Sequence, residues 1–274
     1  MRFESRMAAR AREGDEPTVD PTVDAPSASG WRNWLARLSH FEQARLAEFG
    51  LILLGGFIAA AVLLYAFAWL ATQVLEQETH TVDTGTLEVL LRFNAPQLTL
   101  LANAISLMGS QVVVAVGAAL LAVFLWQRRW GAAVSLILVT AGAQLLNDVL
   151  KEAFHRTRPT AVSGFIDAQQ YSFPSGHAMV SAAFYLYLAY LTWRLVHERW
   201  RRVLLVSGLV LLVVLIGLSR LYLQAHYLSD VIAGYLAGVL WTDSVILGGR
   251  ALTLRTRPRA SGNAPTRQET RAPP

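Results

Sequence analysis

The stretch VLLVSGLVLLVVLIGLSRLYLQAHYLSD (residues 203–230) joins a long apolar run to a cluster of polar side chains. The run, from 202 to 222, has close to the ~20 residues that an α-helix needs to cross the hydrocarbon core of a bilayer. Arg220, His226 and Asp230 follow at its end. Ionisable side chains are costly within a membrane and are therefore candidates for function. The stretch thus predicts a membrane-spanning helix that carries a site at one end.

Apolar stretches of similar length fill most of the chain: residues 50–72, 98–126, 131–151, 177–197 and 227–248. Hydrophobic residues make up 54% of the 274 residues and charged residues 16%, whereas soluble domains carry about 25% charged residues. We therefore predict an all-α fold, a polytopic membrane protein with six transmembrane helices in a bundle. The stretch 98–126 is long, and we expect Gly109 and Ser110 to interrupt it. The absence of cysteine excludes disulfides, a thiolate nucleophile and cysteine-ligated metals.

Four segments are expected along the chain. Residues 1–30 lack apolar periodicity and are predicted to be a disordered cytoplasmic tail. Residues 31–48 place tryptophan and leucine at helical spacing between arginines, which predicts an amphipathic helix at the membrane interface. Residues 49–249 are predicted to form the six-helix membrane domain, and 250–274 a disordered basic cytoplasmic tail. A short amphipathic segment is expected within the polar stretch 76–96.

The positive charges indicate how the chain is oriented in the membrane. Clusters of arginine flank alternate apolar stretches: Arg32, Arg37 and Arg45; Arg128 and Arg129; Arg194, Arg199, Arg201 and Arg202; Arg250, Arg255, Arg257 and Arg259. Because basic loops stay in the cytoplasm, both termini are predicted to be cytoplasmic. This placement explains the net charge of +5 without nucleic acid as a partner. We expect a bacterial inner (plasma) membrane, with any site between the other helix ends at its periplasmic, outer face.

Three groups of polar residues stand at those outer helix ends. The first is Lys151, the only lysine of the chain, followed by Arg158 and Pro159. The second is the run Pro174, Ser175, Gly176 and His177. The third is Ser219, Arg220, His226 and Asp230. Positive charge here runs against the topology signal, so another reason is needed, and we expect the three groups to meet at one membrane face.

The first two groups have the composition of an anion site. Pro174 suits the first turn of a helix, so the backbone N–H groups of Ser175 and Gly176 are expected at a positively polarised helix N-terminus. Lys151, Arg158 and Arg220 add cations: arginine offers a planar fork and lysine a compact charge. Such a set suits a phosphoryl group, whose charge is spread over three oxygens in the transition state.

The third group supplies chemistry. His226 and Asp230 are four residues apart, which places them on one helix face, where a carboxylate selects the imidazole tautomer and leaves the other nitrogen free. Arg220 and His226 are six apart, so one helix is expected to end near Arg220 and the next to start near His226. His177 lies beside the anion site and suits a general acid. No carboxylate cluster is present for Mg²⁺, so we predict phosphoryl transfer with no metal and no cofactor.

Together the patterns K-x6-RP, PSGH and SR-x5-H-x3-D resemble the three signature motifs of the type 2 phosphatidic acid phosphatase family, whose superfamily includes vanadium haloperoxidases and bacterial acid phosphatases. The resemblance covers residues 50–248 and is to a membrane-bound member. It implies that Lys151, Arg158 and Arg220 hold the phosphate and that Ser175 and Gly176 hydrogen-bond it. It also implies a phosphohistidine at His226, oriented by Asp230, with His177 protonating the leaving group and later activating water.

Structural readings compete for several of these residues. His226 with Asp230 is also a possible polar pair between helices, Ser175 to His177 a helix cap, and Lys151 a side chain at a helix end. For Ser219, capping of a helix end and a functional role are equally good interpretations. Asp148, one turn before Lys151, is expected either to support the site or to pack helices, with Gln144 and Asn147 as further polar residues of that span. His155 and Arg156 are expected to face solvent or headgroups, with substrate contact the lesser alternative.

The leading hypothesis is an integral membrane phosphatase for a lipid phosphomonoester or diphosphate, of the undecaprenyl diphosphate, phosphatidylglycerophosphate, phosphatidate or lipid A type. The substrate's tail would stay in the bilayer, and loops 76–96 and 160–173 would select the headgroup. The same site would also serve a phosphotransferase that passes the phosphoryl group to another hydroxyl. A non-catalytic lipid-phosphate binder or anion transporter is a third hypothesis, and vanadate-dependent peroxidase chemistry a remote fourth.

Overall fold

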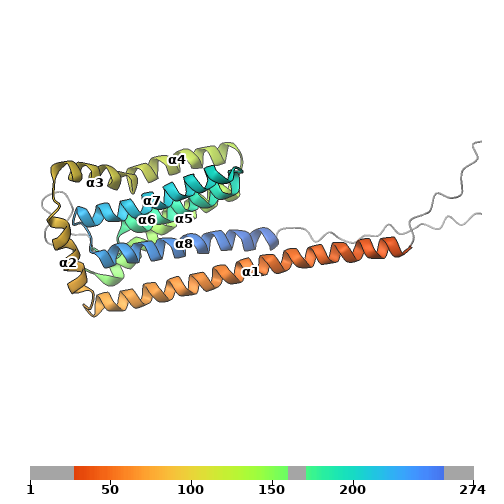
Figure 1. Cartoon of the computed structure of the whole chain (residues 1–274), viewed down its shortest axis with the longest axis horizontal. Coiled ribbons are helices and arrows are strands. Elements are labelled where there is room, and N and C mark those ends of the chain that lie inside the picture. Colours follow the sequence, from red (N-terminus) through yellow and green to blue (C-terminus); the bar gives the residue numbers. More distant parts are fainter. Residues whose placement is uncertain (1–27, 160–170, 256–274) are drawn as a thin grey trace, which may run out of the picture. The chain divides into compact units, whose positions relative to one another are not determined.

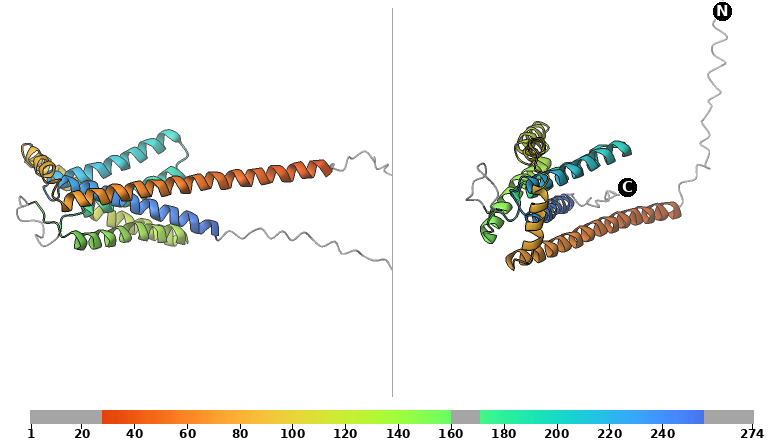
Figure 2. Two further views of the ribbon diagram at one scale, coloured as in Figure 1. Left: turned by 90° about the horizontal axis from the view of Figure 1, so that it is seen from below. Right: turned by 60° about the vertical axis from the view of Figure 1, so that its left-hand side comes forward.

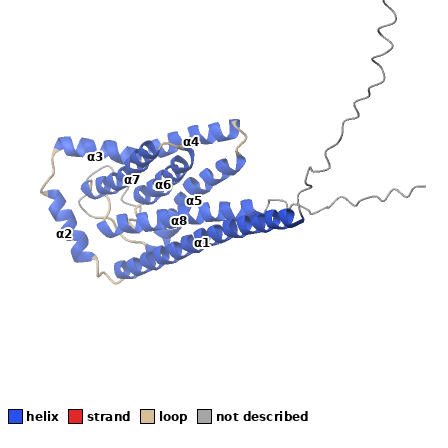
Figure 3. Ribbon diagram, turned by 45° about the vertical axis from the view of Figure 1, so that its right-hand side comes forward, coloured by secondary structure: helices blue, strands red, loops and turns tan. Residues whose placement is uncertain are grey.

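The computed structural model describes residues 28–159 and 171–255, and within these ranges it contains helices and loops but no strand (Figure 3). This confirms the all-α prediction. The helices are α1 (Ala28–Leu75), α2 (His80–Leu91), α3 (Pro96–Met108), α4 (Gln111–Trp126), α5 (Trp130–Phe154), α6 (Gly176–Leu195), α7 (Arg199–Tyr222) and α8 (Leu228–Arg255).

Both interruptions expected from the sequence are present. Gly109 and Ser110 separate α3 from α4, and residues 223–227 separate α7 from α8. The short helix expected within 76–96 is α2. Each break has a functional or packing consequence below, because it redirects the chain at the level where the polar groups lie.

In the part of the chain that the structure describes, five segments are long and apolar enough to cross a membrane: Leu53–Leu75, Pro96–Trp126, Trp130–Phe154, Arg199–Tyr222 and Leu228–Leu252. The sixth predicted span corresponds to α6, which has 20 residues, or about 30 Å of helix, but is less apolar. A helix that is covered by other helices needs fewer lipid-compatible side chains, and nine residues of α6 are buried. Its crossing of the membrane stays a prediction.

The structure divides into two compact units between Ile52 and Leu53. In the first unit the described residues are the N-terminal part of α1, which includes the predicted interfacial helix 31–48; its position at an interface stays a prediction. Residues 28–30 and 250–255, predicted as parts of the tails, belong to α1 and α8. The rest of both predicted tails lies outside the described residues.

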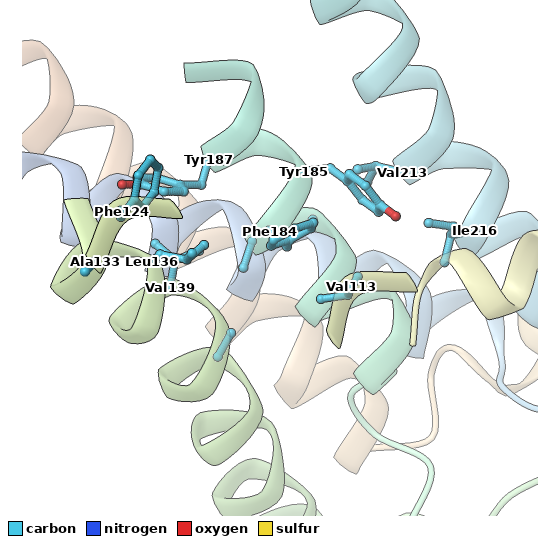
Figure 4. Close-up of a cluster of buried hydrophobic side chains, with 13 residues drawn as sticks. Val113, Phe124, Ala133, Leu136, Val139, Phe184, Tyr185, Tyr187, Val213 and Ile216 are labelled. Carbon is cyan, nitrogen blue, oxygen red and sulfur yellow. The ribbon is translucent and has the colours of Figure 1, made fainter. Parts of the chain in front are cut away.

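In the second unit α6 is the central helix and packs against α5, α7 and α8. Phe184 of α6 is fully buried, with Leu136 and Val139 of α5 on one side and Val213 and Ile216 of α7 on the other (Figure 4). Because lipid tails are as apolar as these side chains, close van der Waals packing, and not transfer from water, favours this association. This core holds the helices whose ends carry the polar groups.

The helix ends that carry the polar groups lie at the same end of the bundle. Helices α5 and α7 finish where α6 and α8 begin, and α2 runs across this end of the bundle in contact with α7 and α8 (Figures 1 and 2). The loops that carry Arg128, Arg129 and Glu198 lie at the opposite end. We call the first end, with α2, residues 155–159 and 171–175 and the loop 223–227, the α2 end.

Gly234 of α8 is required for the close approach of α6. A methyl group there would lie 2.7 Å from the carbonyl oxygen of Ser175 and 2.9 Å from the Cβ of Ala178. The polypeptide before α6 can therefore rest directly on α8, which places Ser175 at the site described below.

We expect Gly234→Ala to lower the thermal unfolding midpoint in detergent, because forced overpacking costs about 1–3 kcal/mol. Gly208→Ala in α7 is the matched control, since a methyl group there meets nothing within 4 Å and should change stability by less than about 0.5 kcal/mol. Equal midpoints for the two variants would contradict the close packing of α6 on α8.

Candidate active site

His226 occupies the loop between α7 and α8 and is buried. Its Nδ1 lies 2.9 Å from the carbonyl oxygen of Ser172. A carbonyl oxygen only accepts hydrogen bonds, so Nδ1 carries the proton and Nε2 keeps its lone pair. Asp230 Oδ2 is farther away, at 3.6 Å. The Ser172 carbonyl is thus the nearer acceptor for this proton, and the role predicted for the Asp230 carboxylate in selecting the tautomer stays a prediction.

The imidazole of His226 is neutral over most of the pH range. Burial lowers its pKa from the ordinary 6.5 to about 4, against the opposing effect of the Asp230 carboxylate. A neutral ring with a free Nε2 is the form that can act as a nucleophile. With Nδ1 protonated, Nε2 accepts a hydrogen bond from Nη1 of Arg158 at 3.4 Å, so its lone pair is directed toward one of the predicted phosphate-binding cations.

Asp230, at the start of α8, is fully buried and its carboxylate is enclosed by donors. Oδ2 accepts hydrogen bonds from the Ser172 hydroxyl and from the backbone N–H of Tyr227 at 2.9 Å. Oδ1 accepts from Arg156 Nη1 at 2.6 Å. Asp230 therefore acts on His226 through Ser172, whose hydroxyl binds the carboxylate and whose carbonyl binds the ring.

The three predicted phosphate-binding cations come from two helix ends: Lys151 and Arg158 from the end of α5 and the residues after it, and Arg220 from the end of α7. Arg158 Nη1 donates to the carbonyl oxygen of Ala225 at 2.9 Å, which holds the residue before His226. Arg220 Nη1 donates to the Ser106 hydroxyl at 2.7 Å. Lys151 is close enough to interact electrostatically with both arginines. The structure thus brings these three cations together.

The run before α6 is held between two helices. The amide of Asn147 in α5 donates to the carbonyl oxygen of Pro174 at 3.3 Å, and the Ser175 N–H donates to the carbonyl oxygen of Asp230 at 3.0 Å. Gly176 leaves no room for a side chain, because a Cβ there would lie 2.9 Å from Asn147 Oδ1. His177, the next residue, interacts electrostatically with the three cations and with His226.

Two buried donors at this place have no hydrogen-bond partner within residues 28–159 and 171–255, the Ser175 hydroxyl and Arg220 Nε, and neither does the acceptor Asn147 Oδ1 beside Gly176. Buried donors without a partner cost free energy of about 1–3 kcal/mol each. Both groups are donors, and they lie in a site with excess positive charge. An anion with several oxygen acceptors, such as a phosphoryl group, satisfies them.

The predicted supporting residues differ in burial and in their hydrogen-bond partners. Pro159 and Pro174 are buried. The Ser219 hydroxyl donates to the carbonyl oxygen of Ile216 at 2.6 Å, a bond within its own helix. Asp148 is exposed and accepts a hydrogen bond from Gln144 at 2.9 Å; it forms no ion pair with Lys151, and its support of the site stays a prediction.

Sequence reasoning misplaced Arg156. It was expected to face solvent or headgroups, like the exposed His155, but its side chain is 11% exposed and binds Asp83 and Asp230. Two carboxylates raise the pKa of Arg156 although burial opposes this. Sequence reasoning gave no role to Asp83, which lies in the polar stretch 76–96. Its signal was weak, since nothing in sequence spacing links α2 to α8 across 146 positions.

The described residues contain no group of three or more His, Asp or Glu side chains arranged to hold a metal ion. Metal independence stays a prediction.

Comparison with known proteins agrees with these features. Residues 132–249 match the PAP2 superfamily. Phosphatidylglycerophosphatase B of Bacillus subtilis (strain 168) is 33% identical over 132 residues, which cover 47% of this chain and 62% of that relative. The crystal structure of a transmembrane PAP2 type phosphatidylglycerolphosphate phosphatase from Bacillus subtilis superposes with a TM-score of 0.61 at 25% identity, covering 73% of this chain and 98% of that one.

The fold and the site thus define an integral membrane protein of helical type with a cluster of cationic side chains and buried donors at one end of its bundle. The match to the PAP2 superfamily over residues 132–249 includes every residue of the three motifs. The resemblance inferred from those motifs is confirmed.

The low pKa of His226 predicts how stability depends on pH. The unfolded chain binds a proton at this ring near pH 6.5, whereas the folded protein does so only near pH 4. Between these values the unfolded state holds more protons, so stability falls as the pH falls. Thermal midpoints of wild type should therefore drop more steeply from pH 6.5 to 4 than those of His226→Gln. Parallel curves for the two proteins would show that His226 is not neutral when folded.

Proposed function

We propose that this protein is a lipid phosphatase that removes a phosphoryl group from a lipid phosphomonoester or diphosphate through a phosphohistidine at His226. The observation that carries the proposal is the orientation of His226, whose Nδ1–H is bound to the Ser172 carbonyl and whose Nε2 faces Arg158. The unpartnered Ser175 hydroxyl and Arg220 Nε beside it supply donors for phosphoryl oxygens. Phosphatidylglycerophosphate is the first substrate to test, in view of the relatives' names.

In the first step, Nε2 of His226 attacks phosphorus, and the N–P bond forms as the bond from phosphorus to the lipid oxygen breaks. The ring becomes cationic, because Nδ1 keeps its proton, and the negative Asp230 carboxylate stabilises it through Ser172. His177 gives a proton to the departing lipid oxygen. Lys151, Arg158 and Arg220 stabilise the equatorial oxygens, where negative charge is concentrated.

In the second step, His177 takes a proton from water and the hydroxide attacks phosphorus. The N–P bond breaks, inorganic phosphate leaves, and His226 returns to its neutral form. If another hydroxyl compound replaces water, the same chemistry becomes a phosphotransfer. No metal ion or cofactor takes part in this scheme.

The test is phosphate release by the purified protein from a panel of lipid phosphates and diphosphates, with EDTA and with vanadate. We expect release that survives EDTA, is blocked by vanadate, and falls at least about 1,000-fold in His226→Ala, since loss of a nucleophile removes the reaction path. His155→Ala is the matched control, because His155 is 57% exposed at the same end of the bundle, and it should keep wild-type activity.

Equal activity in His226→Ala and wild type would rule out the phosphohistidine. Transfer of labelled phosphate to an added lipid or sugar alcohol without release would identify a phosphotransferase. Binding of lipid phosphate with no turnover by folded protein would identify a binding protein.

We also propose that the α2 end faces the outside of a bacterial inner membrane, because the arginine-rich loops lie at the other end. The sequence has no cysteine, so a single introduced cysteine is the only thiol of the chain that a maleimide can modify. In intact spheroplasts, Glu78→Cys should react with a membrane-impermeant maleimide, and Arg128→Cys, which is also exposed, should react only after lysis. The opposite labelling pattern would reverse the topology.

A further inference from the structure

Asp83 is a buried carboxylate contributed by α2, outside the three motifs and outside residues 132–249. It is 1% exposed. Its Oδ1 accepts the backbone N–H of Ser229 at 2.9 Å, and its Oδ2 accepts the Ser229 hydroxyl at 2.6 Å. These bonds place a negative charge at the N-terminus of α8, where the helix dipole is favourable. Asp83 therefore caps the helix that carries Asp230.

Arg156 connects Asp83 to the site. Its Nη2 donates to Asp83 Oδ2 at 2.8 Å, and its Nη1 donates to the Ser229 hydroxyl at 2.7 Å and to Asp230 Oδ1 at 2.6 Å. Its guanidinium lies over the ring of Tyr227, 4.4 Å from the centroid. Its backbone carbonyl accepts the N–H of Ser172 at 2.8 Å. One residue thus contacts both segments that orient His226.

The charges of this group explain why two carboxylates are needed. Arg156 alone would neutralise Asp230, and the pair would then offer little stabilisation to a cationic ring at His226. Asp83 adds a second negative charge. The three side chains of Asp83, Arg156 and Asp230, which we call the charge unit, therefore carry −1 together. The buried arginine is compensated, and the unit as a whole remains negative toward His226.

We propose that Asp83 and Arg156 are positioning residues that act through Asp230 and Ser172, keeping His226 in its reactive tautomer and the unit beside it at one negative charge. This inference rests on the proposed phosphatase function. Neither residue belongs to the phosphate cradle of Lys151, Arg158, Ser175 and Arg220. Helix α2, which lies across the bundle end (Figure 1), is accordingly part of the catalytic apparatus.

Steady-state kinetics test the charge argument. Asp83→Asn leaves the unit neutral and Arg156→Gln leaves it at −2, so each should lower kcat about 10- to 100-fold, the usual cost of a misplaced catalytic group, with KM changed less than about threefold. The double variant Asp83→Asn/Arg156→Gln restores −1 and should be more active than Arg156→Gln. Losses that simply multiply in the double variant would overturn the proposal.

Further variants separate charge, geometry and folding. Arg156→Lys keeps the charge but loses the fork, and we expect its kcat between those of wild type and Arg156→Gln. Ser229→Ala removes only the hydroxyl that joins Arg156 to Asp83, so it reports on the unit if a charge variant does not fold. Glu88→Gln on α2 and Arg92→Gln after it change exposed residues and should match wild type. Wild-type kcat in folded Asp83→Asn and Ser229→Ala would overturn the proposal.

A measurement that needs no turnover separates this inference from the proposed function. ¹⁵N NMR of histidine-labelled protein, with His226 assigned from the spectrum of His226→Gln, should show the Nδ1–H tautomer in wild type. Asp83→Asn and Arg156→Gln should show mixed tautomers or a shifted pKa. This result with an inactive wild type would leave the positioning role standing and reject the phosphatase. Unchanged His226 signals in both variants would reject the positioning role whatever the activity.

Discussion

The site depends on the complete burial of one carboxylate, that of Asp230. A buried charge is tolerated only when it is paired and hydrogen-bonded, and here the donors come from distant parts of the chain: Arg156, the Ser172 hydroxyl and the Tyr227 backbone. Each donor belongs to a segment that also holds a functional group. Satisfying Asp230 therefore aligns the loop before α6 with the start of α8, and His226 is oriented as a consequence.

The helix bundle makes this burial possible. Because α6 is covered by α5, α7 and α8, the polar residues at its N-terminus lie in a protein interior and not in lipid. Small residues at the contact, such as Gly234, let the backbone of Ser175 rest on α8. The same cover explains the lower apolarity of α6, so one packing arrangement accounts both for a helix that is poorly recognised as a span and for a protected anion site.

The predictions from sequence succeeded where the signal was local. Length and apolarity identified the spans, Gly109 and Ser110 marked the break between α3 and α4, and the six-residue separation of Arg220 and His226 required a break between α7 and α8. The three motifs indicated the family resemblance because the residue types and spacings within each motif can be read directly from the sequence. The prediction failed for Arg156, and the Ser172 carbonyl near His226 Nδ1 was not foreseen, since both depend on which groups meet across a loop.

The sequence by itself determined a helical membrane protein with cationic and histidine side chains at one set of helix ends, because hydrophobic length and helical spacing are properties of contiguous residues. Only the tertiary structure decided that Ser172, a residue with no motif of its own, accepts the imidazole proton. It also decided that Asp83, which resembles any acidic loop residue, caps α8 and balances Arg156. Partners of buried charges are chosen by three-dimensional proximity, and that proximity exists only after the helices have packed.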